Sequence, residues 1–448
     1  MDKKELFYIG AFTFFLIFFA IFSTKIQFHD VNEYITVSKA LAGINNINVF
    51  TGHSSVYPAI ISLFLRIWPS FIMLRLVNVL WLLLSGLILF FWLKNKKAFI
   101  IYAFSPIVWH ISIQTTPVLP ASFFFLLAFI FFKKDSIKYN YFYSGFFLGL
   151  SFAIYTPMLL VAFFFMLIYF WNKNFSGLVR YLAFFLIGFL PRLILDFYLY
   201  GNPVYTLIRY CGANFIISLG MNPVVTNYEI FYQYQGLLIF VLISPFLFRL
   251  YKLKWGIYKK EILFFLIIGS IFLIRAALIK YFIILTPLII VYLSSVLSER
   301  EVKWHCIISL FLILFLTYNY FTINEENIIE SDLKQIISDY KVDYLIAYPI
   351  NQAQMFASLS WDEKPRFVWF QDFNASLTNK TKIRGYDFSF NSKIPLKESL
   401  VISASFNRFD SDLIYENYML VSTKDFIPPE SFKLERCYNR LCIYSPLS

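Results

Sequence analysis

The chain has 448 residues, of which 59% are hydrophobic, 21% aromatic and only 15% charged. This composition excludes an ordinary soluble globular protein and is typical of a membrane protein that crosses the bilayer several times. The formal net charge of +12 does not indicate a nucleic-acid partner. Lys and Arg fall in short clusters between apolar segments and do not form a basic domain.

Long apolar segments follow one another from the N-terminus to residue 322. The first is flanked by charged residues and lacks a small-residue cleavage site, so we interpret it as a retained transmembrane helix. A helix needs roughly twenty apolar residues to cross a bilayer, or somewhat fewer if its ends are anchored. The sequence therefore predicts about eleven spans, near 6–24, 70–93, 98–114, 117–132, 141–156, 157–172, 180–200, 235–249, 261–277, 281–298 and 304–322.

The basic clusters lie on alternate connections between these spans. The positive-inside rule places such clusters in the cytoplasm, which puts the N-terminus inside and, after an odd number of spans, the C-terminus outside. The clusters are Lys3/Lys4, Lys94/Lys96/Lys97, Lys133/Lys134/Lys138, Lys173/Arg180, Arg249/Lys252/Lys254/Lys259/Lys260 and Arg300/Lys303.

The first external loop, about residues 24–69, is long for a connection in a helical bundle. Residues 55–68 are apolar enough for a further span, but an extra span would invert every later basic cluster. We therefore predict a helix at the membrane interface there, with Arg66 and Trp68 at its polar edge. Val31–Leu41 has helical periodicity as well, so the loop is expected to form two short juxtamembrane helices.

The composition changes after Phe321, where acidic residues and mixed helical and strand patterns begin. Residues 323–448 are predicted to form a small extracytoplasmic α/β domain beside a transmembrane domain at 1–322. The fold class is thus mainly α, a polytopic helix bundle with this domain attached. Helices are expected at Ile328–Lys341 and Gln352–Leu359, and strands at Asp343–Tyr348, Arg366–Phe370, Leu400–Ala404, Tyr418–Ser422, Phe432–Arg436 and Leu441–Tyr444.

Cys437 and Cys442 are separated by four residues. The spacing suits a bridged hairpin if this segment is extracytoplasmic, and the two cysteines are too isolated for a zinc site. Asn374 and Asn379 begin glycosylation sequons, in agreement with an external location.

An ordered set of motifs runs through the membrane part. It begins with Asp30-Val-Asn-Glu33-Tyr34, then Ala40-Leu-Ala-Gly43, Tyr57-Pro58 and Arg75-Leu76. Asp196-Phe-Tyr-Leu-Tyr200-Gly201-Asn-Pro203 and Lys280-Tyr281 with Thr286-Pro287 follow. The set resembles the C-superfamily (GT-C) of integral-membrane glycosyltransferases, including the mannosyltransferases that use dolichyl-phosphate mannose, over residues 1–322.

The resemblance implies inverting transfer of a sugar from a polyprenyl- or dolichyl-phosphate donor to an acceptor hydroxyl on the outer or lumenal face. Mannose is the hexose that it favours. Glycan, lipid and protein acceptors all occur in the superfamily. The membrane would be the plasma membrane of a prokaryote or the endoplasmic reticulum of a eukaryote.

Such a transfer needs a carboxylate at the membrane surface to take the acceptor's proton. Asp30 matches the family's acid and is our candidate for the base. The family commonly has a second acid directly after the first, whereas here Val31 intervenes and Glu33 stands beside Tyr34. Glu33 is therefore a supporting group, a ligand of a divalent ion such as Mg²⁺ or Mn²⁺ together with Asp30, or itself the base. Asp30 also suits the N-cap of a helix beginning at Val31.

Further side chains are candidates for substrate binding. His29 and His53 can orient a sugar or complete a metal site, and Tyr57 can stack on a sugar ring. Arg75, Arg275 and Lys280 are candidates for the donor phosphate; Lys280 lies in the family motif, and Arg holds a phosphate bidentately. Arg66, Arg192 and Arg209 are the other basic residues predicted on the external side or within helix ends. The alternative for Arg75, Arg192 and Arg275 is snorkelling to the interface or pairing with Asp196 or Glu229.

Two rival functions remain compatible with the sequence. One is a lipid or polysaccharide transporter or flippase, which would pair charges near the bilayer midplane, although no internal repeat is evident. The other is an assembly protein of GT-C type that has lost activity, which the altered Asp30–Glu33 spacing permits.

Overall fold

The computed structural model describes residues 3–24, 30–44, 53–133, 140–171, 174–218, 238, 241–242, 244–245, 279–322, 325–348, 352–362, 364–369, 380–383, 386–389 and 417–447. The chain divides into two compact units. The first, the helical unit, contains Met1–Ser23, Arg75–Leu195 and Asn227–Phe321. The second, the mixed unit, contains Thr24–Leu74, Asp196–Thr226 and Thr322–Ser448.

Apolar helices make up the described part of the helical unit. They occupy every predicted span except two. The spans predicted near 235–249 and 261–277 lie largely or wholly outside the described residues. Among described residues, three helices are long and apolar enough to cross a membrane: Phe71–Trp92, Phe175–Tyr200 and Glu299–Tyr318. The helices are α1 (Lys3–Phe22), α4 (Phe71–Leu87, continued by η1, Ile88–Trp92), α5 (Lys96–Ala103), α6 (Pro106–Ser112), α7 (Val118–Lys133), α8 (Asn140–Ile154), α9 (Met158–Trp171), α10 (Phe175–Tyr200), α14 (Ile279–Val296) and α15 (Glu299–Phe321).

One predicted span differs from the structure. Residues 98–114 form two short helices, α5 and α6, separated at Phe104 and Ser105. Pro106 is the first residue of α6, where its missing N–H is tolerated, but it cannot continue α5. A proline therefore divides a segment that hydropathy alone treats as continuous.

Glycines allow α8 and α10 to pack closely. A Cβ on Gly145 would overlap the carbonyl oxygen of Tyr181, and one on Gly149 would overlap that of Phe185. From the other side, a Cβ on Gly188 would overlap the carbonyl oxygen of Phe146. The two backbones thus meet without intervening side chains, as in helix pairs with small residues four apart.

The mixed unit begins with two short helices, α2 (Asp30–Ala42) and α3 (Val56–Leu65), which contact each other. They lie where the sequence predicts juxtamembrane helices. Arg66 follows α3 and donates a hydrogen bond of 2.9 Å to the carbonyl oxygen of Leu41. Leu63 and Ile67 are exposed, as an interfacial helix requires, although contact with a membrane stays a prediction.

The C-terminal part of the mixed unit holds a five-stranded sheet in the order β2-β1-β5-β7-β6. β1 pairs in parallel with β2 and β5, whereas β7 pairs antiparallel with β5 and β6. The strands are β1 (Tyr344–Tyr348), β2 (Arg366–Trp369), β5 (Tyr418–Thr423), β6 (Phe432–Cys437) and β7 (Leu441–Pro446). Each of them lies at a predicted strand, while the strand expected at 400–404 lies outside the described residues.

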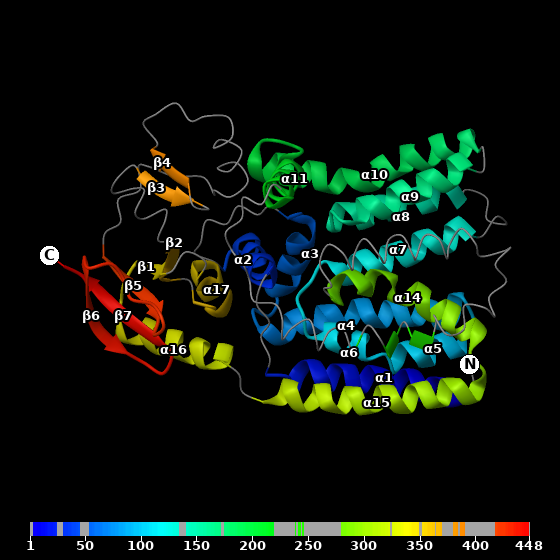
Figure 1. Ribbon diagram of the computed structural model, residues 1–448, viewed down its shortest axis with the longest axis horizontal. Helices are drawn as coiled ribbons and strands as arrows, with labels where there is room; N and C mark the ends of the chain where they lie inside the picture. The colour runs from blue at the N-terminus through cyan, green and yellow to red at the C-terminus, as the bar shows by residue number, and fades with distance from the viewer. Residues whose placement is uncertain are drawn as a thin grey trace. The chain divides into compact units, whose positions relative to one another are not determined.

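Two helices, α16 (Glu325–Asp339) and α17 (Gln352–Leu359), cover one face of this sheet (Figure 1). Ile336 of α16 and Phe356 of α17 are fully buried against Leu345 of β1 and Ile443 of β7. Both helices match their predictions. A short antiparallel pair, β3 (Lys380–Ile383) and β4 (Tyr386–Ser389), was not predicted. The boundary predicted between 1–322 and 323–448 stays a prediction.

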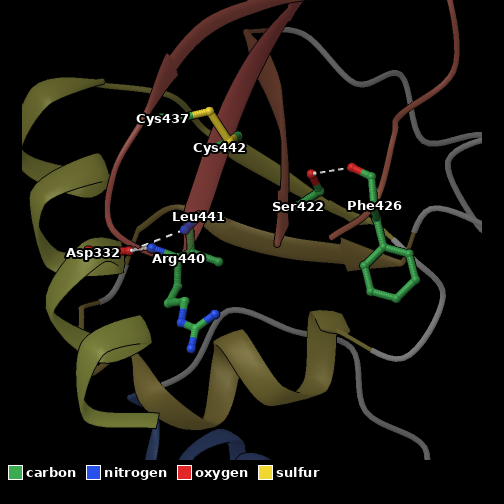
Figure 2. The surroundings of a disulfide bond; sticks show 7 residues. All are labelled: Asp332, Ser422, Phe426, Cys437, Arg440, Leu441 and Cys442. Atoms are coloured by element: carbon green, nitrogen blue, oxygen red, sulfur yellow. Dashed lines mark hydrogen bonds between the residues drawn. A yellow bond between two sulfur atoms is a disulfide. The ribbon is translucent and has the colours of Figure 1, made fainter. Parts of the chain in front are cut away.

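The turn from β6 to β7 is closed by a disulfide between Cys437 and Cys442, the pair that the spacing favours (Figure 2). Asp332 of α16 supports the same turn. Its carboxylate accepts hydrogen bonds from the main-chain N–H groups of Arg440 (2.6 Å) and Leu441 (3.1 Å). The hairpin is therefore fixed both covalently and to the helix layer.

Candidate functional site

Helix α2 carries the central acidic residue of the candidate site. Glu33 lies in its first turn, and the hydroxyl groups of Thr36 and Ser38 bond back to main-chain carbonyls of the same helix. Asp30 is the first residue of α2; its side chain lies outside the described part of the chain, as does all of His29. The sequence predicts a helix beginning at Val31 with Asp30 as its N-cap, and in the structure the helix begins one residue earlier, at Asp30.

Glu33 and His53 form a pair. The imidazole Nδ1 of His53 lies 2.9 Å from Oε2 of Glu33, and the main-chain N–H of His53 lies 3.4 Å from Oε1. Both side chains are mostly buried, with 25% of the His53 and 17% of the Glu33 side chain exposed. A carboxylate hydrogen-bonded to Nδ1 fixes the orientation of the ring.

Aromatic rings surround this pair. Tyr34 lies 5.4 Å from the ring of His53 and 5.7 Å from that of Tyr57, while Tyr210 of α11 (Tyr205–Ser218) lies 5.9 Å from His53. Tyr57 is fully buried. The imidazole of His53 therefore contacts two tyrosine rings, one from α2 and one from α11.

The end of α10 and the start of α11 add a polar layer from the motif that contains Asp196 and Tyr200. Tyr200 Oη lies 3.1 Å from Ser55 Oγ, and its ring stacks on Tyr205 at 4.4 Å. Arg209 Nη1 donates to Tyr205 Oη at 3.1 Å. Arg209 is thus linked to Ser55 through Tyr205 and Tyr200, all within the mixed unit.

Asp196 secures the connection between those helices. Its Oδ2 accepts hydrogen bonds from the main-chain N–H (3.0 Å) and the hydroxyl (2.6 Å) of Thr206. Asp196 and Thr206 are both fully buried. The acid of this motif therefore fixes the turn that presents Tyr205 and Arg209.

Arg75 has a different setting, in the helical unit. Its guanidinium donates from Nη1 to the carbonyl oxygens of Ala20 (3.2 Å) and Ser23, at the end of α1. Such contacts satisfy carbonyls that a helix end leaves without intrahelical partners. Arg192 is likewise buried in this unit and donates to Thr156 Oγ1 at 2.8 Å. A phosphate-binding role for Arg75 stays a prediction.

The other two phosphate candidates cannot be placed. Arg275 lies outside the described residues. Lys280 belongs to the first turn of α14, but its side chain is not among those described.

A metal site is not formed by the described side chains alone. No group of three or more His, Cys, Asp or Glu residues among them is arranged to hold an ion. Glu33 and His53 would supply two ligands to such an ion, and Asp30 is the residue that the sequence offers as a third. Divalent-metal binding stays a prediction.

Several residues of this site were not singled out by the sequence analysis. Tyr200 lies within a quoted motif, which signalled its segment, and Arg209 was noted only among external cations. Tyr34 was seen as part of a motif, whereas Tyr205 and Tyr210 gave no signal among thirty-one tyrosines. Tyr205 and Tyr210 reach the site through the packing of α11, and sequence periodicity does not predict that packing.

The described residues form mostly apolar helices, with a small sheet in the C-terminal part of the chain. Among solved structures the chain is similar to ArnT from Cupriavidus metallidurans bound to undecaprenyl phosphate. The TM-score is 0.63, and the match covers 99% of this chain and 98% of that chain at 11% sequence identity. No protein-family model and no curated protein sequence matches. At this identity the likeness establishes a shared fold, and residue roles have to be argued separately.

Proposed function

We propose that this protein is a membrane glycosyltransferase that moves a hexose, mannose in the first instance, from a polyprenyl-phosphate donor to an acceptor hydroxyl. The single observation that carries the proposal is the fold match, which spans nearly the full length of both chains and reaches a protein bound to undecaprenyl phosphate. The pairing of Glu33 with His53 supports it, because Asp30, which the sequence resemblance matches to the family's acid, is the first residue of the helix that carries Glu33.

The proposed reaction follows from these residues. The carboxylate of Asp30 takes the proton of the acceptor hydroxyl while the hydroxyl oxygen bonds to the anomeric carbon. The bond from that carbon to the phosphate oxygen breaks, and polyprenyl phosphate leaves with inversion at the anomeric carbon. Lys280, Arg275 and Arg75 are the candidate cations for the departing phosphate. His53, held by Glu33, orients the sugar or acceptor.

The orientation of the chain is part of the proposal. The C-terminal domain is placed outside the cytoplasm by the basic clusters, and the Cys437–Cys442 disulfide supports that side because disulfides persist in oxidising compartments. Transfer would then occur on the outer face of the membrane.

The test is transfer in vitro by the purified full chain. Polyprenyl-phosphate mannose and polyprenyl-phosphate glucose are each supplied with lipid, glycan and peptide acceptors. Asp30→Asn is expected to lower turnover by about 100-fold or more, since general base catalysis contributes on that order. The variant should insert into membranes and elute from size exclusion as the wild type does.

Near-normal turnover of Asp30→Asn would exclude Asp30 as the base. Absence of transfer from every donor by the wild-type protein would contradict the proposed function.

A further inference from the structure

Lys39 lies in the last turn of α2, and its side chain is fully buried. Lysine is almost never fully buried unless its charge has partners. Here Nζ donates to three main-chain carbonyl oxygens, those of Ala357 (3.2 Å), Ser358 (2.6 Å) and Ser360 (2.6 Å). An ammonium group has three N–H donors, so its full hydrogen-bonding capacity is used.

The acceptors belong to the C-terminal end of α17. The last four carbonyls of a helix lack intrahelical partners and carry the negative end of the helix dipole, so a cation there is favourable. The Trp361 ring adds a cation–π contact, with Nζ 3.8 Å from its centroid. Loss of water still lowers the pKa of Lys39 well below its usual value, although Glu330 and Asp362 act in the opposite direction.

A second hydrogen bond joins α2 to α17. Ser358 Oγ donates to Asn32 Oδ1 at 2.9 Å, and both side chains are buried. Asn32 and Lys39 are seven residues apart, about two helical turns, so they lie on the same face of α2. Helix α2 is therefore held at both of its ends, which fixes its rotation as well as its position along its axis.

Glu33 directly follows Asn32 and projects about 100° further around the helix. A rotation of α2 would therefore move the Glu33 carboxylate relative to His53, whose Nδ1 lies 2.9 Å away. Asp30, as the first residue of the same helix, would move with it.

We propose that Lys39 is a positioning residue: through it, the C-terminal α/β domain orients α2 and thereby aligns the acidic residues of the transferase site. The C-terminal domain then contributes to the geometry of the site. This inference rests on the proposed function for its catalytic consequence, but the alignment of α2 is a property that can be measured without any activity.

The experiment compares Lys39→Met with a matched control, Lys364→Met. Lys364 is a lysine of the same unit whose ammonium also makes a hydrogen bond, 3.1 Å to Asp343, but whose side chain is 77% exposed. Hydrogen–deuterium exchange of the full-length protein in detergent is followed in peptides from α2, α15 and the β5–β7 strands. Turnover and donor KM are measured on the same samples.

For Lys39→Met we expect exchange in α2 to rise and kcat to fall, each by about tenfold or more, with donor KM changed much less. The basis is the loss of hydrogen bonds from a charged group at a buried contact. Exchange in α15 and β5–β7 should stay at the wild-type level, and the Lys364→Met protein should match wild type throughout.

Ser358→Ala serves as a second variant in case Lys39→Met does not fold. It removes the Ser358 hydroxyl that bonds Asn32 while leaving all three main-chain acceptors of Lys39 in place. In the Ser358→Ala protein, exchange in α2 should rise and kcat should fall by about two- to fivefold each, as expected for the loss of one neutral hydrogen bond.

The proposal would be overturned if a folded Lys39→Met protein showed the same hydrogen–deuterium exchange in α2 as the wild-type protein. An equal rise of exchange in α2, α15 and β5–β7 would also overturn it, because Lys39 would then stabilise the whole fold without positioning α2. Selective loss of protection in α2 with unchanged kcat would also overturn it. If the wild-type protein transfers no sugar but α2 still loses protection selectively, the proposed function fails and the alignment of α2 by Lys39 stands.

Discussion

Glu33 and His53 show how residues that are separate in the sequence form one chemical unit. They are twenty residues apart and come from α2 and from the segment before α3. The sequence predicts an acid in the first helical turn and a histidine in a loop. Their contact depends on the packing of α2 against α3, a tertiary interaction that leaves no periodic pattern.

A double-mutant cycle tests whether this pair acts as a unit. Glu33→Gln and His53→Gln are each expected to lower kcat/KM about 10- to 100-fold, the range for a hydrogen bond to a charged group. The double variant should be no worse than the poorer single variant, because both changes remove the same interaction. Sugar transfer by purified protein provides the measurement.

Arg436→Gln is the control for this cycle, since it breaks the exposed Arg436–Asp339 ion pair and should leave kcat/KM unchanged. Losses that multiply in the double variant would mean that Glu33 and His53 act independently.

The hydrogen-bond partners of Lys39 could not be predicted from the sequence. The sequence has helical periodicity over Val31–Leu41, and this periodicity does not identify a partner for Lys39. Its actual acceptors are main-chain oxygens of residues 357, 358 and 360, and carbonyl groups have no sequence signature. Only the structure could identify it.

At the scale of elements, apolar length and strand patterns were sufficient for most helices and for the strands of the main sheet. The failures have local causes. Pro106 divides one predicted span into α5 and α6. β3 and β4 have only four residues each, and their pattern is too short to stand out. The close contact of α8 with α10 was also missed, although Gly145 and Gly149 form a G-x-x-x-G sequence.

Gly149→Ala tests that contact. The added methyl group would overlap the carbonyl oxygen of Phe185, so α8 and α10 must separate, at a cost of about 1–3 kcal/mol. We expect a lower thermal midpoint in detergent, measured by size-exclusion chromatography after heating. Gly10→Ala is the matched control, because a Cβ there meets nothing within 4 Å. A midpoint for Gly149→Ala at or above that of Gly10→Ala would contradict the close packing.

For the molecule as a whole, hydropathy and charge predicted an integral membrane protein with a small C-terminal α/β domain, and the described residues form mainly apolar helices with a small C-terminal sheet. Composition alone could not show that residues 24–74 and 196–226 belong to the same compact unit as 322–448. That grouping results from contacts between segments far apart in the chain, such as those of Lys39 with α17.

The side of the membrane on which this unit lies can be tested by thiol labelling. Ile427 is 90% exposed in the α/β domain. In a protein with Cys211 and Cys306 replaced by Ser, Ile427→Cys should react with a membrane-impermeant maleimide added outside intact cells or lumenally to microsomes. Lys96→Cys, in a predicted cytoplasmic cluster, should react only after permeabilisation. The reverse pattern would invert the proposed topology.

The contact between Lys39 and Ala357 spans 318 residues of chain. Translation proceeds at ~5–20 residues per second, so α2 is made roughly 15–60 s before α17 can receive its ammonium group. During that interval Lys39 has none of its final acceptors and has to remain hydrated. The pocket for its charge is completed only near the end of synthesis, so a chain truncated before α17 would lack an ordered α2. Assembly of the site is thereby tied to completion of the polypeptide.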